Sequence, residues 1–336
     1  MPETHIVLAH GNGGRYMREL IEGIFSRYLE NRHLDINADA VAIPLPHGEI
    51  VVTTDGFTVQ PLEFPGGDIG TLAVHGTVND LAVSGARPHF LTLNVFVEEG
   101  FEIAQLDRII SSLAKAAIEA GVAVAAGDTK VLRHGEGGGL YLATTGIGIR
   151  TPGLRLGLSE IRAGDAIMVS GPVGDHGVAV MLAREEYGLR GELCSDVANV
   201  FPLTEALLDL GGVRFMRDPT RGGLATVMHD IVRTTGLSVL IEEEQVPVRD
   251  PVRSVCEILG YDPLFLACEG RVIAVVSAEI AEVALRTWHR IPAGKHAAII
   301  GTVSSSHGHP RAILNTALGG ERLIDELEDD PLPRIC

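Results

Sequence analysis

The chain has 336 residues, of which 46% are apolar and 21% are charged, a composition typical of a folded protein long enough for two domains. Its formal net charge of −17 argues against a binder of nucleic acids or anionic membranes, because such proteins need a basic surface. No stretch approaches the roughly 20 apolar residues that span a bilayer, and no signal-peptide pattern opens the sequence, so we expect a cytoplasmic protein.

A glycine-rich turn, His10-Gly11-Asn12-Gly13-Gly14, is the first motif of the chain. Apolar residues then recur at helical spacing from Tyr16 to Leu29, which predicts a helix with one buried face. Backbone N–H groups at such a turn can bind phosphate, although a plain flexible turn explains this motif alone equally well.

Carboxylates follow at positions that suit ligand binding. Residues 49–54 form a predicted strand that leads into Asp55, and the glycine-rich loop 64–70 carries Asp68. In the apolar helical stretch that comes next, Asp80 needs a partner, because burying a lone carboxylate is costly. A cation is the natural candidate.

The remainder of the first half continues the alternation of strands and helices. Its pattern predicts strands at 89–99, 122–126 and 140–149 and a helix at 102–120. Gly121 suits the end of that helix as a C-cap residue. Asp128 directly follows a short buried strand and stands two residues before Lys130, so we expect it at a strand end.

The segment 151–164, with Pro152 and Gly153, has the composition of a crossing between domains. We therefore expect three parts: an N-terminal domain at 1–155, a C-terminal α/β domain at 156–325, and a mobile tail at 326–336.

The second half carries further acidic motifs. Asp175 lies in a glycine-rich turn before a helix predicted to run through Arg184, and Asp218 suits the N-cap of another helix, with Pro219 as its first residue. Glu269 stands on a turn before a strand at 271–277. A helix containing Trp288 and a strand at 297–303 follow.

The cysteines form no C-x-x-C pair, which argues against a zinc ribbon or a thioredoxin-like redox centre. Cys256 and Cys268 lie among apolar residues and are expected in the core. His307 and His309 are close in sequence, but they have no third ligand nearby, so we expect them in solvent.

The chain ends in a cysteine. Pro331 and Pro333 disfavour regular structure, so Cys336 is expected on an extended arm as a candidate reactive thiol, or simply as a frayed end. The ten steps from Glu326 to Cys336 reach roughly 33 Å when extended.

Several aspartates beside glycines or at element ends together predict a cluster, although a turn or cap explains any single one better. Such carboxylates are ligands for Mg²⁺, which usually accompanies a nucleotide triphosphate. No Walker-type loop is present, since His296 follows Gly294-Lys295. We therefore expect an ATP site of another design. The six aspartates are Asp55, Asp68, Asp80, Asp128, Asp175 and Asp218.

Seven motifs spread from the first half of the chain to its last residue resemble the HypE family, hydrogenase maturation factors of the superfamily that includes PurM, SelD and ThiL. The terminal cysteine tail separates this family from the rest of the superfamily. The motifs are Thr53-Thr54-Asp55, Pro65-Gly66-Gly67-Asp68-Ile69-Gly70, Val78-Asn79-Asp80-Leu81-Ala82, Gly127-Asp128-Thr129-Lys130, Gly174-Asp175-His176-Gly177, Asp218-Pro219-Thr220-Arg221-Gly222-Gly223 and Pro333-Arg334-Ile335-Cys336.

The resemblance implies a two-domain α/β fold in which the N-terminal sheets of a homodimer pair into a barrel, with ATP and Mg²⁺ at or near that interface. It implies metal or phosphate binding by Asp55, Asp80, Asp128 and Asp218. It implies nucleotide binding by a wider set: Gly11, Gly13, Asp55, Asp68, Asn79, Asp80, Asp128, Thr129 and Asp175.

The implied activity is that of a carbamoyl dehydratase. Cys336 would receive a carboxamide from the carbamoyltransferase HypF, ATP would drive its dehydration to a thiocyanate, and the cyanide would pass to iron on HypC–HypD for [NiFe]-hydrogenase. Lys130 and Glu269 are the candidate bases, although Lys130 could equally bind phosphate and Glu269 could be a turn carboxylate.

Two alternatives stay open at the level of the sequence. The chain could be another ATP-dependent enzyme of the superfamily that acts on a free small molecule, as a selenophosphate or aminoimidazole ribotide synthetase does. It could also be a non-catalytic scaffold for hydrogenase assembly, although a scaffold gains nothing from several buried carboxylates.

Overall fold

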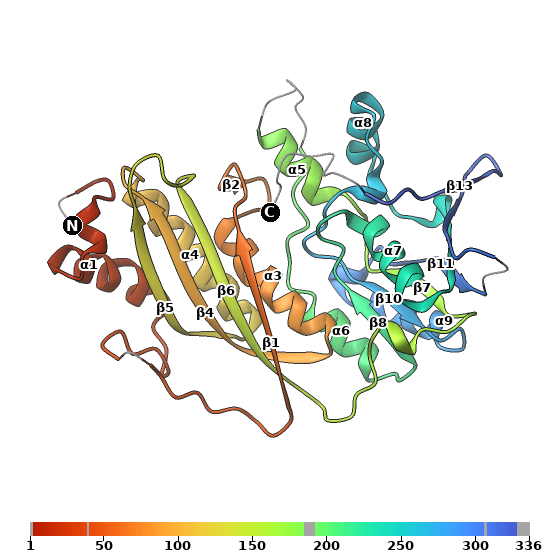
Figure 1. Ribbon diagram of the computed structural model, residues 1–336, viewed down its shortest axis with the longest axis horizontal. Helices are drawn as coiled ribbons and strands as arrows, with labels where there is room; N and C mark the ends of the chain where they lie inside the picture. Colours follow the sequence, from red (N-terminus) through yellow and green to blue (C-terminus); the bar gives the residue numbers. More distant parts are fainter. Residues whose placement is uncertain (1–2, 39, 185–191, 306–307, 328–336) are drawn as a thin grey trace.

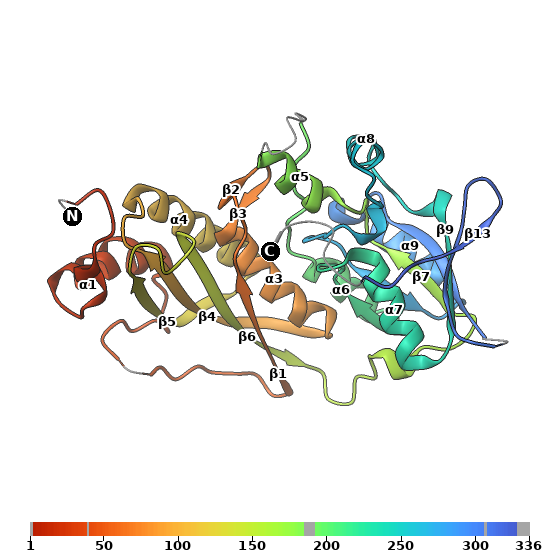
Figure 2. The same cartoon turned by 45° about the horizontal axis from the view of Figure 1, so that its top comes forward.

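The structure is a computed structural model that describes residues 3–38, 40–184, 192–305 and 308–327. Two large β-sheets, each with its own helices, lie side by side (Figure 1 and Figure 2), so the expected mixed α/β architecture is confirmed. None of the helices in these four ranges is long and apolar enough to cross a membrane.

The N-terminal sheet has the strand order β1-β6-β4-β5, with β4 and β5 parallel and the other pairs antiparallel. Helix α4 is the crossover between the parallel strands, and α3 and α4 lie across one face of the sheet (Figure 1). On the opposite face Ile50 and Val52 of β1 are each 61% exposed. The elements are β1 (Glu49–Phe57), α3 (Ile69–Val83), β4 (Ala86–Glu98), α4 (Ile103–Ala120), β5 (Ala123–Leu132) and β6 (Leu140–Arg150).

Short elements flank this sheet. The predicted N-terminal helix is confirmed, but a wider π-helical turn at Ile21–Ser26 interrupts it, and Leu20, Ile24, Phe25 and Leu29 form its buried face. The bounds are α1 (Arg15–Leu20), α2 (Arg27–Leu29), β2 (Glu63–Phe64) and β3 (Gly67–Asp68).

The second sheet has seven strands in the order β13-β12-β9-β11-β7-β10-β8. Residues of α7 pack in the core on one face, whereas α6 and α9, with the fully buried Trp288, pack in the core on the other. Its helices are α5 (Asp175–Ala183), α6 (Phe201–Leu208), α7 (Gly223–Thr235), α8 (Asp250–Leu259) and α9 (Ala281–His289). Its strands are β7 (Ala166–Val169), β8 (Val213–Arg217), β9 (Ser238–Glu242), β10 (Ile273–Val276), β11 (Ala298–Ser304), β12 (Ala312–Asn315) and β13 (Glu321–Leu323).

Two sequence-based expectations are wrong. Asp218 is not a helix N-cap, because α7 begins at Gly223 and its N-cap, Gly222, has a left-handed φ of +70°. The short strand expected at 122–126 continues as β5 to Leu132, so Asp128 lies within a strand and not after its end.

Other local predictions are confirmed. Gly121 ends α4 in the left-handed conformation with φ +70°, as a C-cap glycine should. Cys256 and Cys268 are 3% and 0% exposed and belong to the core. His309 is exposed, whereas His307 falls outside the described residues.

Candidate functional site

Four carboxylates meet between the two sheets. They line one cavity of about 120 Å³, which we call the acidic cavity. Asp55 comes from β1 and Asp80 from α3, whereas Asp218 and Glu269 come from loops beside β8 and β10 of the second sheet. The two halves of the chain therefore build this cavity together.

Strand β1 and helix α3 approach each other closely at the acidic cavity. Thr53 Oγ1 donates a hydrogen bond of 2.7 Å to Oδ2 of Asp80, which gives this carboxylate the partner that its burial requires. A Cβ atom at Gly76 would lie 2.9 Å from the ring of Phe57, so only glycine allows α3 to pack this close to β1.

The carboxylates of the acidic cavity destabilise one another's charged forms. Burial raises the pKa of Asp218 to about 7, and repulsion from Asp80 contributes. Burial likewise raises the pKa of Asp80, with Thr53 opposing this shift. The pKa of Glu269 lies well above its usual value because the side chain is buried and the three aspartates of the cavity repel its charge. Bound cationic charge would therefore stabilise this cluster.

Asn79, next to Asp80 on α3, links this helix to the second half of the chain through hydrogen bonds. Its Nδ2 donates to the carbonyl oxygens of Ala198 and Glu269 at 3.0 and 3.1 Å, and its Oδ1 accepts from the backbone N–H of Val200 at 2.9 Å. These bonds engage both ends of the amide, so in this structure Asn79 positions the backbone of Glu269.

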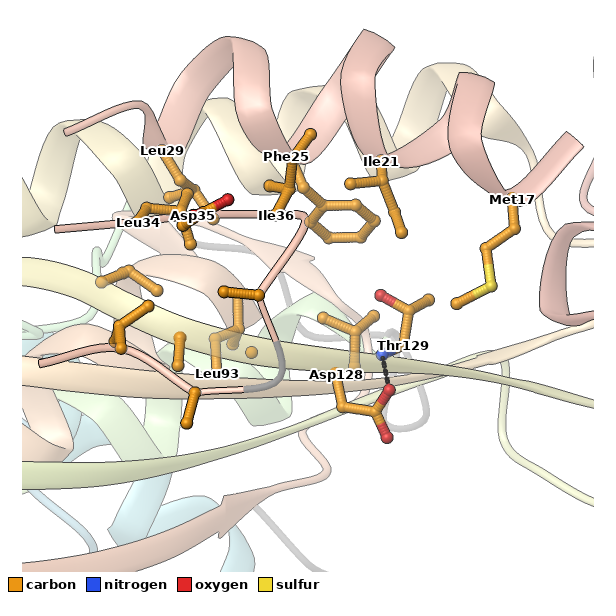
Figure 3. Close-up of a pocket in the computed structure, with 17 residues that line it drawn as sticks. Met17, Ile21, Phe25, Leu29, Leu34, Asp35, Ile36, Leu93, Asp128 and Thr129 are labelled. Carbon is orange, nitrogen blue, oxygen red and sulfur yellow. Dashed lines mark hydrogen bonds between the residues drawn. The ribbon is translucent and has the colours of Figure 1, made fainter. Parts of the chain in front are cut away.

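Asp128 and Thr129 lie outside the acidic cavity. They line a second cavity of about 160 Å³, the edge cavity, between β4, β5 and the apolar side chains of the N-terminal helix (Figure 3). Lys130 Nζ lies 3.4 Å from Oδ2 of Asp128. Because β1 and β5 are opposite edges of the sheet, one chain does not bring this group to the acidic cavity.

The glycine-rich turn also packs at this edge. A Cβ atom at Gly11 would lie 2.9 Å from that of Val131 on β5, so the turn approaches the strand that carries Asp128 as closely as glycine permits. Gly13 has a left-handed φ of +74° and open space around it.

Two of the aspartates named in the sequence do not line either cavity. Asp68 is the N-cap of α3, and its Oδ1 accepts from the N–H groups of Gly70 and Thr71 at 2.7 and 2.9 Å. Asp175 is fully buried and pairs with Arg271 and Arg249 at 3.3 and 3.2 Å. Cys336 lies outside the described residues.

Comparison with known proteins identifies the chain. Models for AIR synthase related proteins match it, the N-terminal domain over residues 37–150 and the C-terminal domain over residues 162–311. The carbamoyl dehydratase HypE of Azotobacter vinelandii is 46% identical over 332 residues, which are 98% of this chain and 97% of that protein. The chain belongs to the HypE family of carbamoyl dehydratases.

Solved HypE structures agree in fold. A HypE structure in complex with ATP matches with a TM-score of 0.93 at 43% identity, covering 98% of this chain and 99% of that one. HypE in a HypE–HypF complex matches with a TM-score of 0.80 at 44% identity, covering 92% and 99%. These relatives confirm the PurM-like fold and favour the HypE branch over the synthetases that act on free small molecules.

The described residues do not form a complete set of protein ligands around a metal ion. Across the described part of the chain, no group of three or more His, Cys, Asp or Glu side chains could hold a metal ion by itself. Mg²⁺ commonly takes only one or two carboxylates and completes its shell with water and substrate phosphates. Asp80 and Asp218 fit that mode, because they are hard oxygen donors whose charged forms lack a cation in this cavity.

Sequence reasoning did not assign a role to Arg221, which also lines the acidic cavity. A signal was present, because this arginine lies three residues after Asp218 in one of the quoted HypE-family motifs.

Proposed function

We propose that this chain uses ATP to dehydrate a carboxamide on the sulfur of its own Cys336, leaving a thiocyanate. The carbamoyl dehydratases among its relatives and the HypE structure in complex with ATP support this reaction. The observation that carries the proposal is the convergence of Asp55, Asp80, Asp218 and Glu269 in one cavity.

The reaction balances without an external oxidant or reductant. The carboxamide oxygen attacks the γ-phosphorus and ADP leaves; the C–O bond then breaks as the nitrogen loses two protons. The products are the thiocyanate, ADP and phosphate. The carboxamide oxygen leaves as part of phosphate; one of the two protons stays on phosphate and the other is released. Such phosphoryl transfer depends mainly on positioning and charge neutralisation.

Glu269 is the proposed base for an amide proton. Its raised pKa makes its carboxylate a stronger base than an exposed glutamate, and Asn79 fixes its backbone. Asp80 and Asp218 would hold Mg²⁺, which when bound neutralises charge on the phosphates, and Asp55 would help to position the metal and the phosphates from the same cavity. With that charge present, Asp80 and Asp218 would stay ionised and orient the nucleotide.

We propose that a homodimer completes the nucleotide site. A cavity of about 120 Å³ is small beside the 300–1,000 Å³ of ordinary ligand sites. Pairing of the open sheet faces, which expose Ile50 and Val52, into a barrel would bury this apolar area and bring Asp128, Thr129 and Lys130 of one subunit to the acidic cavity of the other. The apolar edge cavity would then hold the base, and the Gly11–Gly13 turn would lie near the phosphates.

We propose the same partners as for the family. The HypE–HypF complex supports a HypF-type carbamoyltransferase as the donor, and HypC–HypD would accept the cyanide for the iron of [NiFe]-hydrogenase. We also propose a domain boundary near residue 155 and a tail at 326–336 that carries the substrate on the sulfur of Cys336.

The decisive experiment follows the intact mass of the full chain after carbamoylation of Cys336. With ATP and Mg²⁺ the carbamoylated chain should lose one water, and Cys336→Ala should accept no carboxamide and show no loss. An unchanged mass under turnover conditions would favour a scaffold. Full substrate-dependent ATP turnover by Cys336→Ala would instead favour an enzyme that acts on a free small molecule.

A further inference from the structure

The turn that carries Glu269 is bound by a carboxylate from a segment distant in sequence. Oδ1 of Asp196 accepts the backbone N–H of Glu269 at 3.1 Å, and its Oδ2 accepts the backbone N–H of Gly270 at 3.4 Å. The side chain of Asp196 is completely buried. Because hydrogen bonds to a charged acceptor are stronger than neutral ones, this contact holds the peptide groups on both sides of the Glu269 Cα atom.

Gly270 lets this turn lie directly on the backbone of Asp196. A Cβ atom at position 270 would lie 1.8 Å from the carbonyl oxygen of Asp196 and 3.0 Å from the backbone nitrogen of Ala198. Only glycine allows so close an approach, so any side chain at this position would push the turn away from Asp196.

The residues that follow Asp196 also hold helix α3. Asn79 of this helix bonds to the carbonyl oxygen of Ala198 and to the N–H of Val200, as described above. Helix α3 lines the acidic cavity, and so does Glu269. One short segment of the chain therefore fixes these two walls of the cavity with respect to each other.

The carboxylate of Glu269 has no such support of its own. Within the described part of the chain, no group forms a hydrogen bond or an ion pair with it, and the residue is 3% exposed. The place of this carboxylate in the acidic cavity is therefore set by the backbone of Glu269 and by the packing around it.

We infer that Asp196 is a positioning residue for the dehydration, because it fixes the backbone of Glu269 and thereby aims the Glu269 carboxylate at the amide nitrogen of the substrate. This inference rests on the proposed role of Glu269 as the base. A base must lie within hydrogen-bond distance of the proton that it takes, and a misplacement of about 1 Å can cost roughly 100-fold in rate. The negative charge of Asp196 has a second effect, since it contributes to the raised pKa of Glu269 and so strengthens the base.

A different role for Asp196 would be that of a counter-ion for Arg271, whose Nε lies 3.4 Å from Oδ2 of Asp196. Arg271 has other partners, because it lies 3.3 Å from Asp175 and donates to the carbonyl oxygen of Pro172 at 2.8 Å. The positioning role is favoured, since both oxygens of Asp196 accept N–H groups of the turn at Glu269. A counter-ion would affect stability alone, whereas a positioning residue also affects the chemical step.

The first test measures the single-turnover rate of water loss from the carbamoylated full chain by intact mass, at saturating ATP and Mg²⁺. We expect Asp196→Ala to react roughly 10- to 100-fold more slowly, with an unchanged dissociation constant for ATP. Asp196→Asn keeps one acceptor for the N–H of Glu269 and should react at an intermediate rate.

Asp165→Ala is the matched control. Asp165 is also buried, accepts the N–H of Arg162 at 2.7 Å and lies 3.6 Å from Arg214, but it lines neither the acidic cavity nor the edge cavity. This variant should lose stability and keep the rate of water loss.

The second test follows hydrogen exchange of the full chain without nucleotide, at the backbone N–H groups of Glu269 and Gly270. Both groups should exchange faster in Asp196→Ala than in Asp165→Ala, because only the first variant removes their acceptor.

Each result decides one question. An unchanged rate of water loss in folded Asp196→Ala, or an equal loss of rate in Asp165→Ala, would overturn the inference and leave Asp196 as a counter-ion. Failure of the unaltered chain to lose water would overturn the proposed function instead, and hydrogen exchange would still decide whether Asp196 holds the turn. If Asp196→Ala does not fold, the same measurements on Asp196→Asn decide the question.

Discussion

Thr53 and Asp80 join the first strand of the N-terminal sheet to its covering helix through a hydrogen bond of 2.7 Å at the wall of the acidic cavity. The hydroxyl favours the ionised form of Asp80, against burial and the charge of Asp55, which both raise its pKa. A neutral threonine thereby keeps a proposed magnesium ligand closer to its charged state.

Thr53→Val should raise the pKa of Asp80, because it removes this hydrogen bond and keeps the shape of the side chain. The acidic limb of the pH profile for ATP turnover should move to higher pH by roughly 0.5–1 unit. Thr302→Val, at an exposed position of β11, is the control and should leave the profile unchanged. If the acidic limb of the profile does not move in Thr53→Val, the ionisation of Asp80 does not control ATP turnover.

Asp218 should make the free protein less stable as pH rises. Its pKa is about 7 in the folded chain against 3.8 for a free side chain, so the folded state binds the extra proton between these values. The free energy of unfolding should therefore fall with increasing pH in this window, by at most about 1.4 kcal/mol per pH unit for this one group.

Asp218→Asn should flatten that slope between pH 4 and 7, as measured by urea unfolding in the absence of nucleotide and Mg²⁺. Asp209→Asn changes an exposed aspartate and should keep the wild-type slope. Equal slopes in wild type and Asp218→Asn would show that Asp218 ionises normally.

Mixed dimers should reveal whether two subunits build one site. We expect Asp128→Asn and Asp218→Asn each to lose most ATP-dependent dehydration. When the two variants are unfolded and refolded together, half of the dimers should be mixed, each with one intact site, which restores about a quarter of wild-type activity. No recovery on mixing, with mixed dimers verified by mass, would place Asp128 outside the shared site.

Arg271 should be critical for stability. Its side chain is 9% exposed and lies 3.3 and 3.4 Å from the carboxylates of Asp175 and Asp196, which are completely buried. Burial raises the pKa of Asp175 to about 6 even with this arginine and Arg249 beside it. The two arginines therefore offset only part of the cost of burying the charged carboxylate of Asp175.

Arg271→Met should lower the free energy of unfolding by roughly 3–5 kcal/mol at neutral pH, because it removes the arginine beside Asp196 and leaves Asp175 with Arg249 alone. Adding Asp175→Asn should recover part of this loss, and Arg253→Met should change stability by less than about 0.5 kcal/mol. A loss below about 1 kcal/mol for Arg271→Met in urea unfolding would contradict this account.

The sequence predicted local elements well because hydrophobic spacing and cap glycines act over a few residues, as Gly121 illustrates. It also indicated that Asp80 needs a partner. The sequence could not show that Asp128 and Asp55 lie far apart within one chain. Their positions depend on the strand order, which puts β1 and β5 at opposite edges of the sheet. The N-cap role expected for Asp218 is wrong for a local reason: the helix expected to begin at Pro219 begins only at Gly223, after Gly222 in a left-handed conformation.

The last described segment of the chain has a kinetic consequence: His229 donates to the carbonyl oxygen of Ile324 at 3.0 Å, and Arg233 lies 3.7 Å from Glu326. Because residues 324–326 are held along α7 and nine residues then lead to Cys336, the proposed reacting group is covalently tethered close to the proposed site. A short tether between a reacting group and its site typically gives an effective concentration in the millimolar range. Dehydration should thus be first order and insensitive to dilution as long as the proposed dimer persists, and a free tail peptide would compete only at millimolar levels.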